Sequence, residues 1–309
     1  MRNDKNIGIV GLGKMGLNIA LHLKDEGINV IGFNRSPEGR DKAKSQGLDT
    51  ASSVSELIEK VRNNRAIIWI MVPAGAPVDE VLFGSDENIS KYLKEGDIVI
   101  DGGNSYYKDT LARYKKLEER GIHYMDCGTS GGMSGARNGA CLMIGGKKSI
   151  FEEIEWVFSS IAQKEGYFYV GPSGSGNYVK MIHNAIEYGM MQAIAEGIDL
   201  IKNGAYPDVD MEGLLHVWNN GSIIESYLTS VLEKQLREYP NLDEVEGVVE
   251  DNGEGAWTIG EAIERKVPAL AVSHALFERY ASRRSNTIAN KMLALMRNGF
   301  GGHKMVLKK

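Results

Sequence analysis

The chain has 309 residues, a formal net charge of −5 and an isoelectric point near 5.8; 42% of its residues are apolar and 25% are charged. This length favours about two domains, with enough apolar residues for packed cores. The negative charge gives no general attraction to nucleic acid or to an anionic membrane, so we expect neither as a partner. With two cysteines, no metal-ligand spacing and no long apolar run, we expect a cytoplasmic protein without disulfides, metal or membrane spans.

Short apolar runs alternate with amphipathic segments over the first part of the chain. This is the pattern of βαβ units around a parallel sheet. We expect strands at residues 7–10, 29–33, 66–72, 97–101, 123–126, 140–144 and 167–170, and helices that include 15–24, 54–62 and 109–120.

The pattern changes after the glycine-rich stretch 171–176, because apolar residues then recur at helical spacing from 177 to 203. Further helices fit 211–218, 227–239, 258–265, 268–282 and 285–297. The sequence therefore predicts a doubly wound α/β domain of the Rossmann type, residues 1–174, followed by an all-α domain, residues 175–309.

A G-x-G-x-x-G motif follows the first predicted strand and opens a helix. Its glycines allow a tight turn and a close approach of the backbone to a pyrophosphate, and the helix N-terminus presents unpaired N–H groups. This context favours dinucleotide binding over a structural glycine turn. The predicted phosphate-binding residues are Gly11, Leu12, Gly13, Lys14, Met15 and Gly16.

The second predicted strand ends at Asn34, Arg35 and Ser36, without the carboxylate that usually accepts a hydrogen bond from the ribose 2′-OH of NAD. An acidic residue there would repel a 2′-phosphate, whereas the guanidinium of Arg35 can pair with it. We therefore expect NADP, with NAD as the alternative; a solvated Arg35 is the competing interpretation.

Lys180, His183, Asn184 and Glu187 occupy positions i, i+3, i+4 and i+7 of the long predicted helix and share one face. Spacing alone fits a solvated surface equally well. Polar, glycine-rich loops follow several predicted strands, where open α/β sheets bind ligands, and this favours an active site. These loops contribute the candidate ligands Met71, Val72, Pro73, Asn104, Ser130, Gly131 and Gly132.

Over nearly its whole length the chain resembles the decarboxylating 6-phosphogluconate dehydrogenases. The most specific match is the segment 180–189, Lys-Met-Ile-His-Asn-Ala-Ile-Glu-Tyr-Gly, and later matches are 255–258 and 300–303. The related 3-hydroxyacid dehydrogenases resemble the chain at Lys180 and Asn184 but usually lack the continuation. The chain resembles the short class of the family, which includes NAD-preferring members.

The resemblance implies oxidation of 6-phosphogluconate at C3 and loss of CO2 to give ribulose 5-phosphate, a step of the pentose phosphate pathway, with reduction of NADP. Lys180 is then the general base that accepts the C3 hydroxyl proton, and Glu187 is the acid that protonates C1 of the enediol. The ketone acts as the electron sink, so no metal is required. The implied catalytic residues are Lys180, Glu187, Asn184 and His183.

The resemblance also implies a substrate site. The sugar hydroxyls and carboxylate are matched by Asn104, Ser130, Gly131, Gly132, His183 and Asn184. The substrate phosphate is matched by Tyr188, Thr258 and Arg279. Arg297 and His303 match a tail that reaches the substrate of a neighbouring subunit. Ordinary turn residues, a surface arginine and a frayed terminus are the competing interpretations.

One position departs from the family pattern. Ala256 stands before Trp257 where the family commonly has a lysine, and this removes one phosphate partner. Lys266, Arg283 and Arg284 are candidates to compensate.

The long predicted helix carries the apolar residues Ile186, Met190, Met191 and Ile194 on a face that a second copy could cover. We therefore expect a homodimer or a tetramer made from dimers. Two other functions stay open: a 3-hydroxyacid or 3-hydroxyisobutyrate dehydrogenase, which needs no phosphate pocket, and a non-catalytic dinucleotide-binding protein, which needs neither Lys180 nor Glu187.

Overall fold

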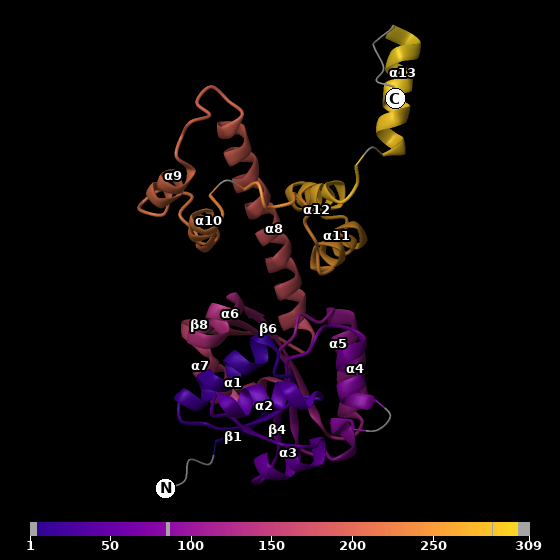
Figure 1. The fold of residues 1–309 in the computed structure, drawn as a ribbon. Coiled ribbons are helices and arrows are strands. Elements are labelled where there is room, and N and C mark those ends of the chain that lie inside the picture. The colour runs from indigo at the N-terminus through magenta and orange to yellow at the C-terminus, as the bar shows by residue number, and fades with distance from the viewer. Residues whose placement is uncertain (1–4, 85–86, 241, 286, 302–309) are drawn as a thin grey trace. The chain divides into compact units, whose positions relative to one another are not determined.

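The computed structural model of the chain describes residues 5–84, 87–240, 242–285 and 287–301 (Figure 1). Two compact units make up the chain, the first ending at His183 and the second beginning at Asn184. The first unit is built on a mostly parallel sheet with helices, and the second is helical. The predicted fold class is confirmed.

The sheet of the first unit has the strand order β3-β2-β1-β4-β5-β6-β7-β8. Strands β1 to β6 are parallel, so the ends of β1, β4, β5 and β6 lie along one edge of the sheet, called here the carboxyl edge. The strands are β1 (Asn6–Val10), β2 (Asn29–Phe33), β3 (Asp49–Thr50), β4 (Ile67–Ile70), β5 (Ile98–Asp101), β6 (His123–Ser130), β7 (Ala140–Gly145) and β8 (Ala162–Gly171).

Two features of the sheet differ from the expectation. Strand β6 continues past Asp126 to Ser130, so Ser130 ends a strand instead of lying in a loop. Strand β7 is antiparallel to β6, with Asp126 opposite Gly145 and Ser130 opposite Cys141. The connection between them, residues 131–139, is shorter than the roughly dozen residues that a parallel crossover needs. A reversed strand is therefore the only pairing that this connection permits.

Helices cover both faces of the sheet. Alternate strand residues enter two cores: Trp69 packs with α1 and α7 on one face, whereas Ile68 and Ile70 pack with α3 and α4 on the other. The helices are α1 (Lys14–Asp25), α2 (Pro37–Ser45), α3 (Val54–Val61), α4 (Ala76–Phe83), the 3₁₀ turn η1 (Ile89–Lys91), α5 (Tyr107–Glu118), α6 (Gly132–Asn138) and α7 (Lys148–Ile161).

Helix α3 shows how local sequence specifies these elements. Val54, Leu57, Ile58 and Val61 have helical spacing and are all buried. The hydroxyl of Ser53 caps the first turn by accepting a hydrogen bond from the backbone N–H of Glu56.

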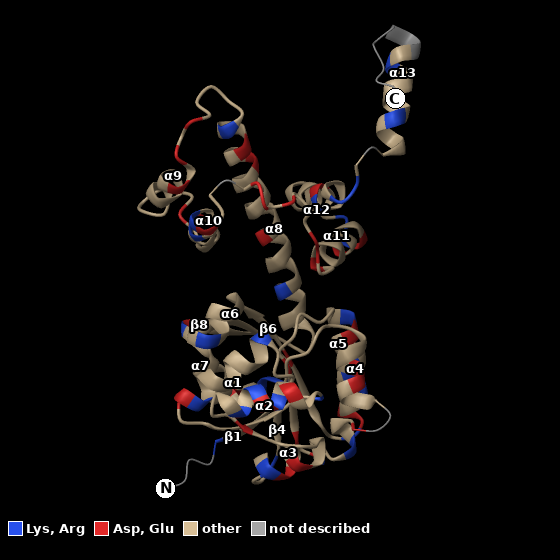
Figure 2. Ribbon diagram, viewed as in Figure 1, with Lys and Arg blue, Asp and Glu red and all other residues tan. Residues whose placement is uncertain are grey.

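Helix α8 (Ser175–Lys202) begins in the first unit and continues into the second. The remaining helices of the second unit are α9 (Met211–Trp218), α10 (Tyr227–Glu238), α11 (Glu254–Arg265), α12 (Leu270–Ser282) and α13 (Ile288–Gly301). Tyr188, Ala275 and Leu276 form one small buried cluster in this unit. Acidic and basic residues are interspersed along α8, α10, α11 and α12 (Figure 2).

Candidate active site

The glycine-rich turn after β1 has the shape of a pyrophosphate cradle. Gly11 has a φ of +96°, and a side chain there would collide with the carbonyl of Met71. A side chain at Gly16 would collide with the carbonyl of Gly11, whereas a Cβ on Gly13 would meet nothing within 4 Å. Gly13 is the N-cap of α1, and no side chain of the described residues caps this helix. Its first-turn N–H groups therefore suit an anion.

Asn34 ties the end of β2 to this turn. Its Oδ1 accepts a hydrogen bond from the N–H of Leu12 at 3.0 Å, and its Nδ2 donates to Oγ of Ser36 at 3.1 Å. Nη1 of Arg40 donates to the carbonyls of Asn34 and Arg35, at 2.7 and 3.0 Å. The side chain of Arg35 is exposed, and within the described ranges its guanidinium forms no ion pair. The hydrogen bonds of Asn34 and Arg40 therefore hold the loop after β2, while the side chain of Arg35 remains available to a ligand.

A buried arginine joins the loops after β4 and β5. Arg113 of α5 is 2% exposed and donates from Nε and Nη2 to the carboxylate of Asp79, at 2.8 and 2.9 Å. Its Nη2 also donates to the carbonyl of Gly75 at 3.0 Å, and its Nη1 donates to Oγ of Ser105 at 3.4 Å. These bonds fix the two loops that carry the predicted ligands Met71, Val72, Pro73 and Asn104.

Asp101, at the end of β5, is fully buried in the same network. Its carboxylate accepts hydrogen bonds from the N–H of Gly103 at 3.1 Å, from Oγ of Ser105 at 2.6 Å and from the Tyr124 hydroxyl at 3.0 Å. Burial raises the pKa of Asp101, and these hydrogen bonds oppose that rise. The sequence analysis missed Arg113 and gave Asp101 no role. A lone arginine in an amphipathic helix carries no signal of its own, whereas an aspartate that ends a strand does.

The first turns of helix α8 lie against β6, from residue 174 to His183. Oδ1 and Oδ2 of Asp126 accept hydrogen bonds from the backbone N–H groups of Gly174 at 2.7 Å and Asn177 at 2.8 Å. Two residues along the strand, Gly128 lies directly against the Cβ of Lys180. Residues two apart on β6 thus face residues three apart on α8, because side chains at these spacings lie on one face of a strand and of a helix.

The contact between α8 and β6 continues to the carboxyl edge. Oγ of Ser130 lies 3.3 Å from Nε2 of His183, and Nζ of Lys180 lies 3.4 Å from Nδ1 of the same imidazole. Lys180 is only 5% exposed. The structure thus brings together three of the predicted site residues, Ser130, His183 and Lys180. Next to them, Gly131 and Gly132 have φ values of +113° and +60°.

A second cluster of predicted residues lies in the second unit. Nδ2 of Asn184 donates to Oε1 of Glu254 at 3.2 Å, and Glu254 is 3% exposed. One turn further along α11, the hydroxyl of Thr258 donates to the carbonyl of Glu254 at 2.9 Å. The ring of Tyr188 lies against Gly255, where a side chain would be crowded. The sequence analysis did not single out Glu254, which is a buried carboxylate beside a predicted substrate ligand.

Arg279 lies over the ring of Tyr188, with its guanidinium carbon 3.5 Å from the ring centroid, and its Nη1 donates to the carbonyl of Glu250 at 2.9 Å. Arg283 is already engaged, since it forms ion pairs with Glu250 at 2.9 Å and Asp251 at 2.8 Å. Tyr188, Thr258 and Arg279 therefore gather around the start of α11.

Two of the three residues proposed to compensate for Ala256 are poorly placed to do so. Lys266 is the C-cap of α11, at the other end of that helix from Ala256. Arg283 is neutralised by its two acidic partners. In the described part of the chain, neither Lys266 nor Arg284 forms an ion pair, and Arg284 directly follows the C-cap of α12.

The remaining predicted residues lie apart from these clusters. Glu187 is half-buried, on the face of α8 that also carries Lys180. Arg297 lies on α13 and is exposed, and it forms no ion pair with the side chains that the structure describes. His303 lies outside the described residues.

No group of three or more histidine, cysteine, aspartate or glutamate side chains suited to a metal ion occurs among the residues described. Within the same ranges, none of the helices combines the length and the apolar character that crossing a membrane requires.

Residues 6–171 match the family model described as the NAD binding domain of 6-phosphogluconate dehydrogenase, and residues 176–305 match the model of the 6-phosphogluconate dehydrogenase C-terminal domain. A relative from Haloferax volcanii, named 6-phosphogluconate dehydrogenase, NAD(+)-dependent, decarboxylating, is 38% identical over 98% of this chain and 99% of its own length. The Saccharomyces cerevisiae relative named 6-phosphogluconate dehydrogenase, decarboxylating 2 is 35% identical over 94% of this chain and 61% of its own.

Among solved structures, 6-phosphogluconate dehydrogenase from Plasmodium falciparum, determined in its apo form and in complexes with NADP+ and with 6-phosphogluconate, aligns with a TM-score of 0.81. It is 30% identical, and the alignment covers 98% of this chain and 66% of that one. A 3-hydroxyisobutyrate dehydrogenase from Salmonella typhimurium has a TM-score of 0.73 at 21% identity and shares the fold.

Proposed function

The chain belongs to the 6-phosphogluconate dehydrogenase family, and from this premise we propose that it oxidises and decarboxylates 6-phosphogluconate with NADP as the preferred oxidant. The observation that carries the proposal is Lys180, a buried lysine held at the carboxyl edge of the sheet with His183 beside it. A buried lysine placed where open α/β sheets bind ligands has a use in proton transfer that a solvated lysine lacks.

The glycine turn at 11–16 holds the pyrophosphate of the dinucleotide, and the loops that carry Met71 and Asn104 flank it. When bound, NADP supplies the hydride acceptor. Arg35 pairs with the 2′-phosphate, because its guanidinium is exposed and uncommitted while Asn34 and Arg40 hold the loop beneath it. NAD is the alternative cofactor, and the NAD(+)-dependent name of the archaeal relative keeps that alternative open.

Lys180 accepts the proton of the C3 hydroxyl as the hydride leaves C3. His183 lies between Lys180 and Ser130 and orients the amine. The resulting 3-keto acid loses CO2, and the protonated amine then donates a hydrogen bond to the developing enolate oxygen. Glu187, two turns further along the same face of α8, protonates C1 of the enediol to give ribulose 5-phosphate.

Ser130, Gly131, Gly132 and Asn104 bind the sugar hydroxyls and the carboxylate in the first unit. In the second unit Asn184 is oriented by Glu254, and Tyr188, Thr258 and Arg279 bind the substrate phosphate. By the family resemblance, Arg297 and His303 of a second copy of the chain also bind the substrate.

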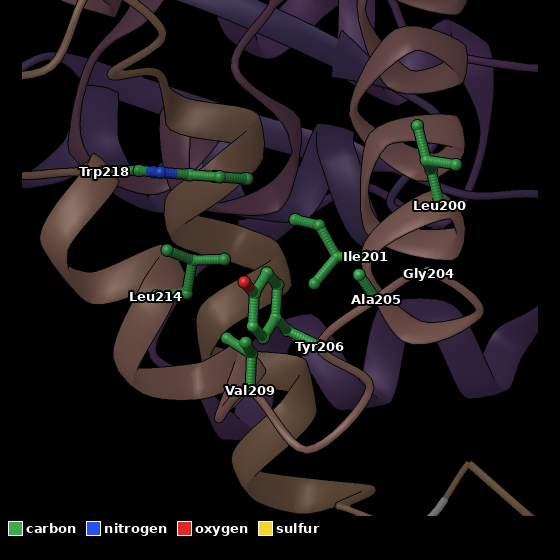
Figure 3. Close-up of a pocket in the computed structure, with 8 residues that line it drawn as sticks. All are labelled: Leu200, Ile201, Gly204, Ala205, Tyr206, Val209, Leu214 and Trp218. Atoms are coloured by element: carbon green, nitrogen blue, oxygen red, sulfur yellow. The ribbon is translucent and has the colours of Figure 1, made fainter.

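Exposed apolar side chains support self-association as a homodimer, or as a tetramer built from dimers. Ile186, Met190 and Met191 of α8 are 54%, 45% and 41% exposed, and every residue of α13 from 288 to 298 is exposed, including leucines and methionines. An apolar hollow of about 480 Å³ also opens near the end of α8 (Figure 3). Its walls are Leu200, Ile201, Gly204, Ala205, Tyr206, Val209, Leu214 and Trp218.

The first experiment measures NADPH formation and CO2 release from 6-phosphogluconate for the wild type, Lys180→Met and Glu187→Gln. Loss of the base should lower kcat by about 10²- to 10⁴-fold while NADP binding is retained. Lys202→Met, at the other end of α8, is the matched control and should keep its kcat. Faster turnover of 3-hydroxyisobutyrate than of 6-phosphogluconate by the wild type would instead favour the other dehydrogenase class.

The cofactor assignment has its own test. Arg35→Asp should raise KM for NADP by at least about tenfold and leave KM for NAD within about twofold, because it replaces an attractive charge at the 2′-phosphate by a repulsive one. Lys44→Asp, which places the same charge change on α2, controls for the general field. Equal losses with both cofactors in Arg35→Asp would contradict the NADP assignment.

A further inference from the structure

The first turn of α8 rests on the sheet through three glycines. A side chain on Gly128 of β6 would collide with Cβ of Lys180. A side chain on Gly145 of β7 would meet Oδ1 of Asp126 and the backbone nitrogen of Gly176, at 2.6 and 2.7 Å. A side chain on Gly176 would meet the carbonyl of Met143 at 2.5 Å. The helix therefore lies closer to β6 and β7 than any side chain at these positions would allow.

Asp126 holds the first turn of α8 against the sheet through hydrogen bonds, and it is called here the polar anchor. It is 0% exposed, and its two carboxylate oxygens each accept one backbone N–H from the start of α8, those of Gly174 and Asn177. These are N–H groups that the helix itself leaves unpaired, and a negative charge at this end also interacts favourably with the helix dipole. A second anchor lies beside it, where Nδ2 of Asn177 donates to the buried hydroxyl of Thr110 at 2.8 Å.

The anchor and the lysine are connected by one short stretch of rigid helix. Asn177 precedes Lys180 by three residues, so the two side chains lie almost one above the other on the face that meets β6. Asp126 precedes Gly128 by two residues and lies on the same face of the strand. The hydrogen bond between Asn177 and Asp126 therefore sets the position of Lys180 relative to Gly128 along β6.

We propose that Asp126 is a positioning residue for Lys180: its carboxylate holds the first turn of α8 on β6 and so sets where the amine of Lys180 stands at the carboxyl edge. The assignment rests on the function proposed above. Asp126 touches neither substrate nor cofactor in this role and acts only through the helix. A carboxylate is needed because both of its oxygens accept, whereas an amide of the same shape would place an N–H group against one of the two backbone donors.

The test compares Asp126→Asn with Asp97→Asn in the full-length protein. Asp97 is a matched control because it is 1% exposed and its carboxylate also accepts two backbone N–H groups, those of Ala66 and Lys94. It precedes β5, however, and so lies at the opposite edge of the sheet. Both changes remove one accepted backbone bond inside the same unit, and Asp97→Asn also weakens the ion pair of Asp97 with Arg62, whose two nitrogens donate to its carboxylate at 2.7 Å.

Per folded molecule, Asp126→Asn should lower kcat with 6-phosphogluconate by about 10- to 100-fold, because a displacement of about 1 Å at a reacting group has effects of this size. The Kd for NADP should stay within about twofold, since the glycine turn is untouched. Asp97→Asn should keep the wild-type kcat even if it is the less stable variant. Equal kcat values for the two variants would overturn the proposal.

A second variant covers the case in which Asp126→Asn does not fold. Gly128→Ala moves the lysine without changing any charge, and it should give the same loss of kcat with the same retention of NADP. Gly197→Ala is its control, because Gly197 lies on α8 with Lys180 and a Cβ at this position meets no atom within 4 Å. A fully active Gly128→Ala variant would count against the proposal.

Hydrogen exchange separates this proposal from the function on which it rests. The amides of Gly174 and Asn177 should exchange at least about tenfold faster in Asp126→Asn than in the wild type, whatever the substrate. If the wild type does not turn over 6-phosphogluconate, the proposed function fails, but the exchange rates of the two amides still test whether Asp126 holds the start of α8. Unchanged exchange at these two amides would refute the anchor itself.

Discussion

Leu57, Ile68 and Trp69 of the first unit are wholly buried, whereas Met292 and Met296 of the second unit are about half exposed. Among the residues that the structure describes, almost all of the buried apolar ones belong to the first unit. In the second unit they are Ala185, Tyr188, Met211, Leu215, Ala275 and Leu276. We infer from this difference that the first unit can be stable through its own packing, and we expect another surface to cover the exposed apolar side chains of the second.

The polar networks differ in the same direction. The side chain of Arg113 in the first unit is 2% exposed. Arg283 in the second unit also pairs with two acidic residues, but its side chain is 26% exposed. Arg113→Met should lower the free energy of unfolding by about 3–5 kcal/mol, because the buried Asp101 then lacks its neighbouring charge. Arg283→Met should cost less than about 1 kcal/mol. Urea denaturation measures both changes in the free energy of unfolding. Similar values for the two variants would contradict the difference proposed between the two units.

The second test replaces an apolar residue of α13. Met292→Asp should weaken self-association by at least about a hundredfold, because a charge would have to be buried in the interface. Asn290→Asp adds the same charge on another side of the helix and should leave association within about threefold. Analytical ultracentrifugation gives both constants. A wild type that is monomeric at every concentration would show that the second unit needs no cover.

The third test follows pH in the first unit. Burial raises the pKa of Asp126 from 3.8 to about 6, and the hydrogen bonds from Asn177 and Gly174 oppose the rise. Because the folded pKa lies above the unfolded one, the contribution of this group to stability is complete below about pH 3.8 and is lost as the pH rises through about 6. The difference between these two values corresponds to about 3 kcal/mol.

Subtracting a variant isolates this contribution. The free energy of unfolding of the wild type minus that of Asp126→Asn should fall by up to about 3 kcal/mol between about pH 4 and pH 7. A difference that is flat with pH would mean that the carboxylate of Asp126 ionises at its ordinary pKa.

The smallest expected effect is at the surface of the first unit. Lys148 and Glu152 of α7 lie 3.7 Å apart, with side chains 71% and 60% exposed. Lys148→Ala should change the free energy of unfolding by less than about 0.5 kcal/mol. Thermal denaturation at low and high salt measures the change, and a larger loss would mean that surface charge, and not the buried core, sustains this unit.

Much of the fold could be predicted because local signals agreed with the final packing. The apolar runs at 7–10 and 29–33 and the glycine motif between them are short-range features, and the strands and helix occur where expected. The reversal of β7 was missed because it depends on the length of the connection 131–139 and on pairing with β6, neither of which leaves a periodic pattern.

The candidate site was predictable where its residues share one element. Lys180 and His183 lie on one helix, so their spacing placed them together, and the structure adds Ser130 to them. Arg113 and Asp126 could not be found in this way, because Arg113 contacts Asp79 and Asp126 contacts the backbone of Gly174 and Asn177, all far away in the sequence. Such roles are visible only once the tertiary structure is known.

The register between α8 and β6 makes chain length itself a constraint. Each residue added to a helix turns the following side chains by about 100° around its axis. One residue inserted between Asn177 and Lys180 would leave the amide of Asn177 on Asp126 but direct the amine of Lys180 away from Gly128. Related sequences should therefore vary in composition along this stretch far more freely than in the number of residues it contains.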